Sequence, residues 1–126
     1  MSALQDLPRE ERLRTTAGLR GTPAIALSAW RGTSGRRYVV GIWDARHVEL
    51  EDLIESVAIG VSRDGNGIAQ LQGVAAGLGL EAGEKWLGEM RRKACTEIHI
   101  HRLCGSAEER SAVAGELNPS TKGARR

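Results

Sequence analysis

Apolar and polar residues alternate along several short stretches of the chain, a pattern typical of β-strands with one buried face. The first two stretches, AIALSAW at 24–30 and RRYVVGIW at 36–43, flank the turn sequence RGTSG and predict a hairpin. A second hairpin is predicted where VAIGVSR at 57–63 and IAQLQGV at 68–74 flank DGNG. The stretch TEIHIHRL at 96–103 alternates in the same way and predicts a further strand.

The spacing of apolar residues changes to a helical period in three places. It predicts a helix over about 80–93 and another over 107–117, where Ser106 and Glu109 are spaced as in a capping box. The sequence at 48–54 predicts a single helical turn between the two hairpins. Together the elements predict an α+β domain, with a mostly antiparallel sheet built from two hairpins plus a later strand, and helices packed on it.

The composition changes at both ends of the chain. Residues 1–22 include DLPREERLR and few apolar side chains, so we expect a flexible or partly helical arm, with a short helix beginning near Pro8. Residues 23–119 hold the predicted strands and helices and are expected to form a single domain. Residues 120–126 are expected to form a basic, flexible tail.

The bulk composition is that of a globular protein with a small, aliphatic core. Of the 126 residues, 40% are apolar and 27% are charged, and the aromatic residues are three tryptophans and one tyrosine. No run approaches the roughly 20 apolar residues needed to cross a bilayer, so we expect no membrane partner. The chain opens with polar residues rather than an apolar secretory leader, and Cys95 and Cys104 are expected to be free thiols in the cytoplasm.

A histidine pair lies on the strand predicted at 96–103. Side chains two apart on a strand share a face, so Glu97, His99 and His101 lie together and Ile98 and Ile100 face the core. The polar trio is interpreted as the solvent side of a half-buried strand. The alternative is a divalent metal site, but spacing places only two certain ligands, so we predict no tightly held metal and no other cofactor.

Basic residues gather at the end of the helix predicted over 80–93 and in the tail at 120–126. The net charge of +2 permits a nucleic-acid partner without requiring one, and cations near a helix C-terminus can also serve to stabilise that helix. The candidate nucleic-acid-binding cations are Arg91, Arg92, Lys93, Arg102, Lys122, Arg125 and Arg126.

Four stretches follow one another between Trp30 and Pro119: WRGTSGRRYVV, VAIGVSRDGNGIAQLQGV, ACTEIHIHR and SAEERSAVAGELNP. In this order they resemble the opening hairpin, the two motif strands, a later strand and the acidic helix of small bacterial domains of the GIY-YIG nuclease family. The resemblance implies an α+β fold and a site for phosphodiester cleavage.

The family's reactive residues are largely missing from the matching positions. In the family, two motif tyrosines, a helix arginine and a metal-binding glutamate surround the scissile phosphate. Ala58 stands at the first tyrosine, and Gln72, or Leu71 if the alignment slips, stands at the second. None of residues 80–82 supplies the arginine, and Lys85 is the nearest substitute.

The resemblance retains Glu116 and Asn118, which match the family's acidic helix and stand as a remnant of its site. A lone glutamate leaves the phosphate without its cation and the nucleophile without its activator. These residues therefore predict a domain that keeps the scaffold and has lost the chemistry.

Three hypotheses for function follow. The leading one is a non-catalytic, GIY-YIG-like binding or regulatory module, with DNA or RNA as the first partner to test. The alternative is a protein-interaction or oligomerisation module anchored by an exposed Trp30 or Trp43. The second alternative is a metal-dependent hydrolase centred on His99 and His101, with Glu97 or Glu116 as a further ligand.

Overall fold

A computed structural model of the protein describes residues 7–12 and 26–118. Most of the predicted arm at 1–22 therefore lies outside the described residues. The predicted tail at 120–126, with Lys122, Arg125 and Arg126, lies outside them as well.

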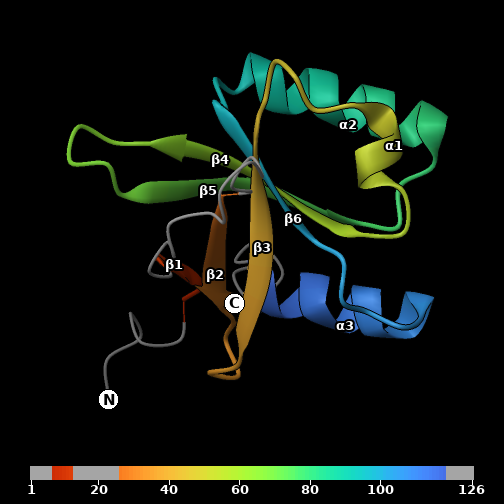
Figure 1. Ribbon diagram of the computed structural model, residues 1–126, viewed down its shortest axis with the longest axis horizontal. Helices are drawn as coiled ribbons and strands as arrows, with labels where there is room; N and C mark the ends of the chain where they lie inside the picture. Colours follow the sequence, from red (N-terminus) through yellow and green to blue (C-terminus); the bar gives the residue numbers. More distant parts are fainter. Residues whose placement is uncertain (1–6, 13–25, 119–126) are drawn as a thin grey trace, which may run out of the picture.

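The described residues form six strands and three helices (Figure 1). In chain order these are β1 (Arg9–Glu11), β2 (Leu27–Arg31), β3 (Arg37–Asp44), α1 (Leu50–Leu53), β4 (Val57–Arg63), β5 (Ala69–Ala76), α2 (Leu80–Arg92), β6 (Glu97–His101) and α3 (Ala107–Leu117). The strands form one antiparallel sheet in the order β1-β2-β3-β6-β4-β5. The predicted α+β fold is confirmed.

Both predicted hairpins are present, and the later strand joins them. β2 pairs with β3 around the RGTSG turn, and β4 pairs with β5 around DGNG. The carboxylate of Asp64 shapes the second turn, because its Oδ1 accepts hydrogen bonds from the backbone N–H groups of Asn66 and Ile68 at 2.8 and 3.0 Å. β6 pairs with β3 on one side and with β4 on the other, so it lies in the middle of the sheet.

The N-terminal segment forms a strand where a short helix was predicted. Residues Arg9–Glu11 pair with β2, and Glu10 lies opposite Trp30. Most of the stability of a helix in a protein comes from packing an apolar face. A helix beginning near Pro8 would have had few apolar side chains to pack, so it would have been unstable. As a strand, the same residues extend the sheet and bring Glu10 inward.

Helices cover both faces of the sheet (Figure 1). On one face Leu53 of α1 and Leu87 and Met90 of α2 pack against the sheet residues Ala58, Ile98 and Ile100. On the other face Val113 and Leu117 of α3 pack against the sheet residues Trp30, Val40, Val57, Ile59 and Val61. Gly60 allows the side chain of Met90 to pack directly against the backbone of β4, where a Cβ atom would collide with its sulfur.

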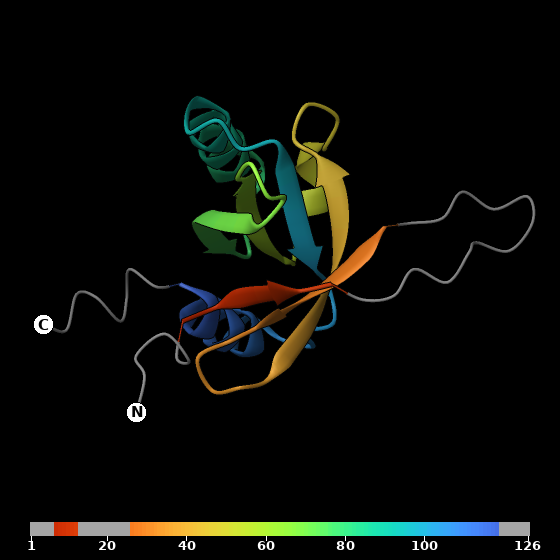
Figure 2. The ribbon, with the colours of Figure 1, turned by 90° about the vertical axis from the view of Figure 1, so that its left-hand side faces the viewer.

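The sheet is strongly curved (Figure 2). β1 comes close to β5, although these two strands stand at opposite ends of the strand order. The curvature turns the face that carries α3 inward, so side chains from β1, β2, β4 and β6 meet there. This inner face positions the polar residues described below.

Two further sequence predictions concern the helices and the thiols. Ser106 caps α3 by accepting a hydrogen bond from the Glu109 backbone N–H at 3.1 Å, while the Glu109 carboxylate accepts from the Gly105 N–H at 3.2 Å. Cys95 and Cys104 are free thiols. Over the ranges 7–12 and 26–118, no helix combines the length and the apolar character that a membrane span requires.

Candidate functional site

The histidines of β6 are buried, so the prediction that they face solvent is wrong. His99 is completely buried and His101 almost completely, while Ile98 and Ile100 face the α1–α2 core as expected. Alternation correctly placed the two sets on opposite faces. It could not show that β1, β2 and α3 cover the second face as well.

Both ring nitrogens of His99 make hydrogen bonds within the protein. The indole N–H of Trp30 donates to Nδ1 at 2.9 Å, and Nε2 lies 2.8 Å from the Glu97 carboxylate. Because an indole N–H only donates, Nδ1 must be the acceptor, and the ring hydrogen resides on Nε2, which donates to Glu97. Burial lowers the pKa of His99, outweighing the opposite effect of the Glu97 carboxylate, and this favours the neutral ring.

The structure does not assemble the metal site considered for Glu97, His99 and His101. His99 has no free ring nitrogen, and His101 donates from Nδ1 to the Val39 carbonyl at 2.7 Å. Among the residues that the structure describes, no three His, Cys, Asp or Glu side chains lie together as a metal-binding group. The geometry therefore gives no support to a hydrolase centred on the histidine pair.

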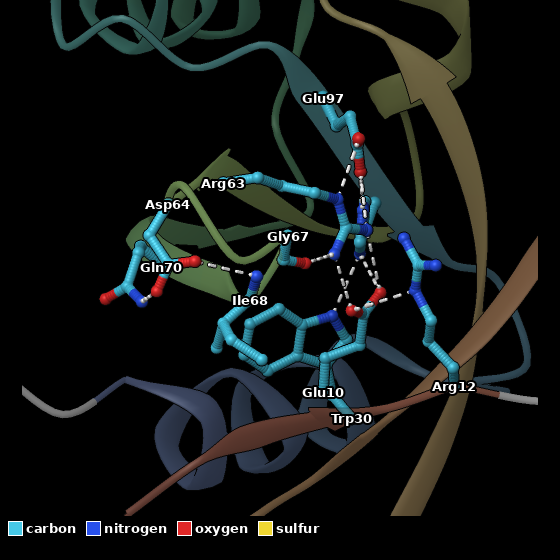
Figure 3. Close-up of polar contacts among 10 residues, drawn as sticks. Glu10, Arg12, Trp30, Arg63, Asp64, Gly67, Ile68, Gln70 and Glu97 are labelled. Carbon is cyan, nitrogen blue, oxygen red and sulfur yellow. Dashed lines mark hydrogen bonds and ion pairs between the residues drawn. The ribbon is translucent and has the colours of Figure 1, made fainter.

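Arg63 is the centre of the polar cluster on the inner face (Figure 3). It donates to both oxygens of Glu10 at 2.8 and 3.1 Å and to both oxygens of Glu97 at 3.0 and 2.9 Å. Its side chain is only 15% exposed and that of Glu10 only 6%. We call Glu10, Arg63, Glu97, His99 and Trp30 the buried polar cluster.

The charges in this cluster stabilise one another. Burial raises the pKa values of Glu10 and Glu97, but hydrogen bonds and attraction from Arg63 outweigh it and lower both pKa values overall. Hydrogen bonds to the two carboxylates raise the pKa of Arg63. The cluster therefore holds one guanidinium between two carboxylates and ties β1, β4 and β6 together.

Alternation along β6 placed Glu97 and His99 together, but the sequence predictions missed Arg63 and Glu10. Arg63 continues the alternation of Val57, Ile59 and Val61, and that period could have placed it on their buried face. Glu10 carried no such signal, because a three-residue strand has too little pattern to read.

Glu116 fastens the β2–β3 turn to the end of α3. Its carboxylate accepts hydrogen bonds from the Tyr38 hydroxyl at 2.7 Å and from the Ser34 hydroxyl, and its carbonyl accepts from the Thr33 N–H at 3.1 Å. Burial and the bond to Glu116 raise the pKa of Tyr38 to about 12. Asn118 forms the C-cap of α3. The Glu116 carboxylate is thus held by hydroxyl groups of the protein.

The other positions matched to the nuclease family do not form a reactive group. Ala58 is buried in the α1–α2 core. Gln72 lies at an irregularity in the β4–β5 pairing and donates to the Ser62 hydroxyl at 2.9 Å. Lys85 lies on α2, beside a shallow polar hollow that Glu81 also lines.

Three of the predicted nucleic-acid-binding cations within 26–118 are engaged by the protein itself. Arg91 donates to the Ala45 carbonyl, and Lys93 pairs with Glu89 at 3.8 Å. Arg102 pairs with Asp52 at 3.0 Å and lies over the Trp43 ring. Arg92 borders the mixed-charge hollow on α2.

Neither of the two tryptophans expected to anchor a partner protein is fully exposed. Trp30 is buried on the inner face, so it cannot be the exposed anchor that was expected. Trp43 packs partly against the α1–α2 core and lies over Gly41.

A different group of cations lies on the outer face of β1, β2 and β3. The register places Arg9 opposite Arg31, and Arg31 opposite Arg37. All three guanidinium groups reach the carboxylate of Glu11, at 3.3 Å for Arg9, 2.7 Å for Arg31 and 3.1 Å for Arg37. We call these four residues the arginine face.

The arginine face is accessible to solvent. Half of the Arg9 side chain and nearly half of the Arg37 side chain are exposed, and Glu11 is partly exposed. Hydrogen bonds from Arg31 lower the pKa of Glu11, with smaller contributions from Arg9 and Arg37. The sequence between 26 and 43 contains arginines and no acidic residue, which is the signal that could have revealed this face.

Comparisons with known proteins give no relative. No protein-family model matches the chain. No curated protein and no solved structure matches it either. Function must therefore be inferred from the fold and the residues.

Proposed function

We propose that the protein is a non-catalytic, GIY-YIG-like binding module that binds nucleic acid through the arginine face. The convergence of Arg9, Arg31 and Arg37 on an exposed strand surface carries this proposal. Guanidinium groups bind phosphate oxygens through paired N–H donors, and Lys and Arg contacts to phosphates supply most of non-specific nucleic-acid affinity.

The local charge favours a polyanion. Three arginines and one glutamate give the arginine face a net charge of 3 − 1 = +2, equal to that of the whole chain. Arg36, in the adjoining turn, adds a further exposed cation. A basic patch of this kind attracts nucleic acid at a distance and holds its backbone at close range.

Two observations support the remaining parts of the proposal. The order β4–β5–α2–β6–α3 is the hairpin, helix, strand and acidic helix that the family resemblance implies. The non-catalytic assignment rests on Ala58 and Gln72 at the tyrosine positions and on Glu116, whose carboxylate is already hydrogen-bonded by Tyr38 and Ser34.

Salt-dependent binding tests the proposal. Fluorescence anisotropy with labelled single-stranded DNA, duplex DNA and RNA should reveal binding at low salt that weakens as salt is added. On duplex DNA each phosphate neutralised contributes about −0.9 to the slope of log affinity against log salt, so Arg31→Ala with Arg37→Ala should flatten the slope by about two units.

The matched control is Lys85→Ala with Arg92→Ala, which removes the same charge from α2. It should leave most of the slope intact. Equal losses in both double variants would show a diffuse charge effect, and absence of binding to all three nucleic acids would refute the proposal.

A cleavage assay tests the non-catalytic part. Incubation with Mg²⁺ or Mn²⁺ and plasmid or single-stranded DNA should give no cleavage above that of a Glu116→Ala variant. Nicking that depends on Glu116 would overturn the assignment and point to Lys85 as the cation.

A further inference from the structure

The three arginines of the arginine face converge on a single point. Arg31 binds both oxygens of the Glu11 carboxylate, with Nε at 2.7 Å from one and Nη2 at 2.9 Å from the other. Arg37 approaches one of these oxygens through Nε at 3.1 Å, and Arg9 approaches the other through Nη2 at 3.3 Å. Cations that only track a nucleic-acid backbone would be spread along it, whereas these surround one anion.

The anion at the centre is supplied by the protein. The Glu11 carboxylate presents two oxygens to the guanidinium groups, and phosphate presents oxygens in the same paired geometry. The carboxylate therefore stands where phosphate oxygens would bind. Its side chain is partly exposed and belongs to a three-residue strand, so it can turn aside without disturbing the core.

The charge of this site selects among phosphate groups. Glu11 keeps its charge beside the site when its side chain turns aside, so the three arginines and this carboxylate together carry 3 − 1 = +2. A phosphate monoester carries about −1.5 to −2 at pH 7 and has three terminal oxygens, which matches this charge. An internal phosphodiester of nucleic acid carries a single negative charge and two such oxygens, so it would leave the site partly unneutralised.

We infer that the arginine face recognises the terminal 5′-phosphate monoester of a nucleic-acid strand, with the Glu11 carboxylate as the internal anion that it displaces. This inference rests on the proposed function, since it names the part of the nucleic acid that the arginine face binds.

The buried polar cluster gives a useful contrast. Arg63 also binds carboxylates through paired contacts, but its side chain is only 15% exposed and it lies between two acids. Those acids leave it no surplus positive charge for a ligand. The arginine face has the opposite balance and is open to solvent.

The test compares two forms of one oligonucleotide. A 12-nucleotide single-stranded DNA carries a fluorophore at its 3′ end and either a phosphate or a hydroxyl at its 5′ end, and anisotropy gives both affinities at about 50 mM salt. The wild-type protein should bind the phosphorylated strand about tenfold more tightly, because two or more charge-assisted contacts are gained. Inorganic phosphate in excess, at constant ionic strength, should reduce that preference.

Two variants separate geometry from charge. Arg31→Lys with Arg37→Lys keeps every charge but removes the paired donors, so the preference should fall to about twofold while binding of the hydroxyl strand is largely kept. Glu11→Gln should tighten binding of both strands about threefold. Glu89→Gln removes one acid from α2 and serves as the matched control, with a change below twofold.

The outcomes distinguish the two proposals. Equal wild-type affinity for the two strands would overturn the 5′-phosphate inference and leave nucleic-acid binding intact. Absence of binding to both strands would overturn the 5′-phosphate inference, and absence of binding to duplex DNA and RNA as well would overturn nucleic-acid binding. Thermal melting checks that each variant folds, and Arg9→Lys, at the most exposed of the three arginines, repeats the comparison if the double lysine variant is unstable.

Discussion

The two faces of β6 differ in how they are stabilised. On one face Ile98 and Ile100 pack under α1 and α2 in a core of aliphatic side chains with Met90. On the other, His99 belongs to a cluster that contains three charged groups and the indole of Trp30. Residues next to one another on a single strand are therefore stabilised by different physical effects.

The two faces of β6 should differ in how well they tolerate amino-acid substitutions. An aliphatic core gains free energy from area removed from water, and related side chains can often replace one another. A buried polar cluster depends on every donor and acceptor being matched, so loss of one member leaves the other groups buried without a partner. Substitution on the two faces should separate these behaviours.

The largest effect is expected on the aliphatic face. Ile98→Asp places a carboxylate where no partner exists and should cost about 4 kcal/mol or more, enough to unfold a domain of this size. Circular dichroism should show loss of cooperative melting, whereas Ile98→Val should melt only slightly below the wild type. Cooperative melting of the Asp variant would mean that this face is not the core.

The next effect is expected at the centre of the buried polar cluster. Arg63→Met keeps much of the side-chain volume but leaves Glu10 and Glu97 without their cation, and should cost about 2–4 kcal/mol, since the pair is not fully buried. Chemical denaturation measures the loss of unfolding free energy.

A double-mutant cycle with Glu10→Gln sharpens that result. Once Arg63 is absent, Glu10→Gln should restore stability, giving a coupling free energy above about 1 kcal/mol. Additive losses would contradict the cluster, and Arg46→Met, at an exposed surface pair with Asp44, should cost far less.

A smaller effect should follow pH. Burial lowers the pKa of His99 from its ordinary value of 6.5. Below about pH 6.5 this histidine therefore binds a proton in the unfolded chain but stays neutral in the folded protein. Unfolding free energy should therefore fall as the pH drops through this range. It should fall again below about pH 4.5, because the pKa values of Glu10 and Glu97 are lowered in the folded state.

Substitution of His99 assigns the first of these two steps. His99→Gln should flatten the dependence between pH 7 and the mildly acidic range, because glutamine has no group that titrates there. The unfolding free energy from urea titrations at several pH values provides the measurement. An unchanged slope in the His99 variant would remove that residue as its source.

The smallest effect is expected at the edge of the inner face. Tyr38→Phe removes one hydrogen bond to Glu116 and should cost about 0.5–1.5 kcal/mol, seen as a fall of a few degrees in Tm. A loss as large as that of Arg63→Met would mean that the turn contributes more to stability than the buried polar cluster.

Much of the fold could be predicted because its signals are local. The hairpins depend on alternation and on turn residues such as Asp64, and α3 begins at the predicted cap, Ser106. β1 could not be predicted in this way. It exists because β2 offers an edge and Arg63 offers a counter-charge, and both lie far away in the sequence.

The candidate site was harder to predict from the sequence, because it also depends on contacts between residues that lie far apart in the chain. Alternation paired His99 with His101 correctly, but burial of that face depends on Trp30 and α3, which come from distant parts of the chain. The hairpin register alone would have placed Arg31 beside Arg37. Arg9 joins them through β1, a strand that local pattern did not reveal.

The ion pair between Glu10 and Arg63 also bears on the order of folding. It joins residues 53 positions apart, whereas each hairpin closes a much shorter loop. Loop closure costs more entropy as the loop lengthens, and contacts between distant residues slow the search for the native state. We therefore expect the hairpins to form early and β1 to dock late, after the transition state. Glu10→Gln, which weakens the ion pair with Arg63, should then accelerate unfolding while leaving the refolding rate almost unchanged.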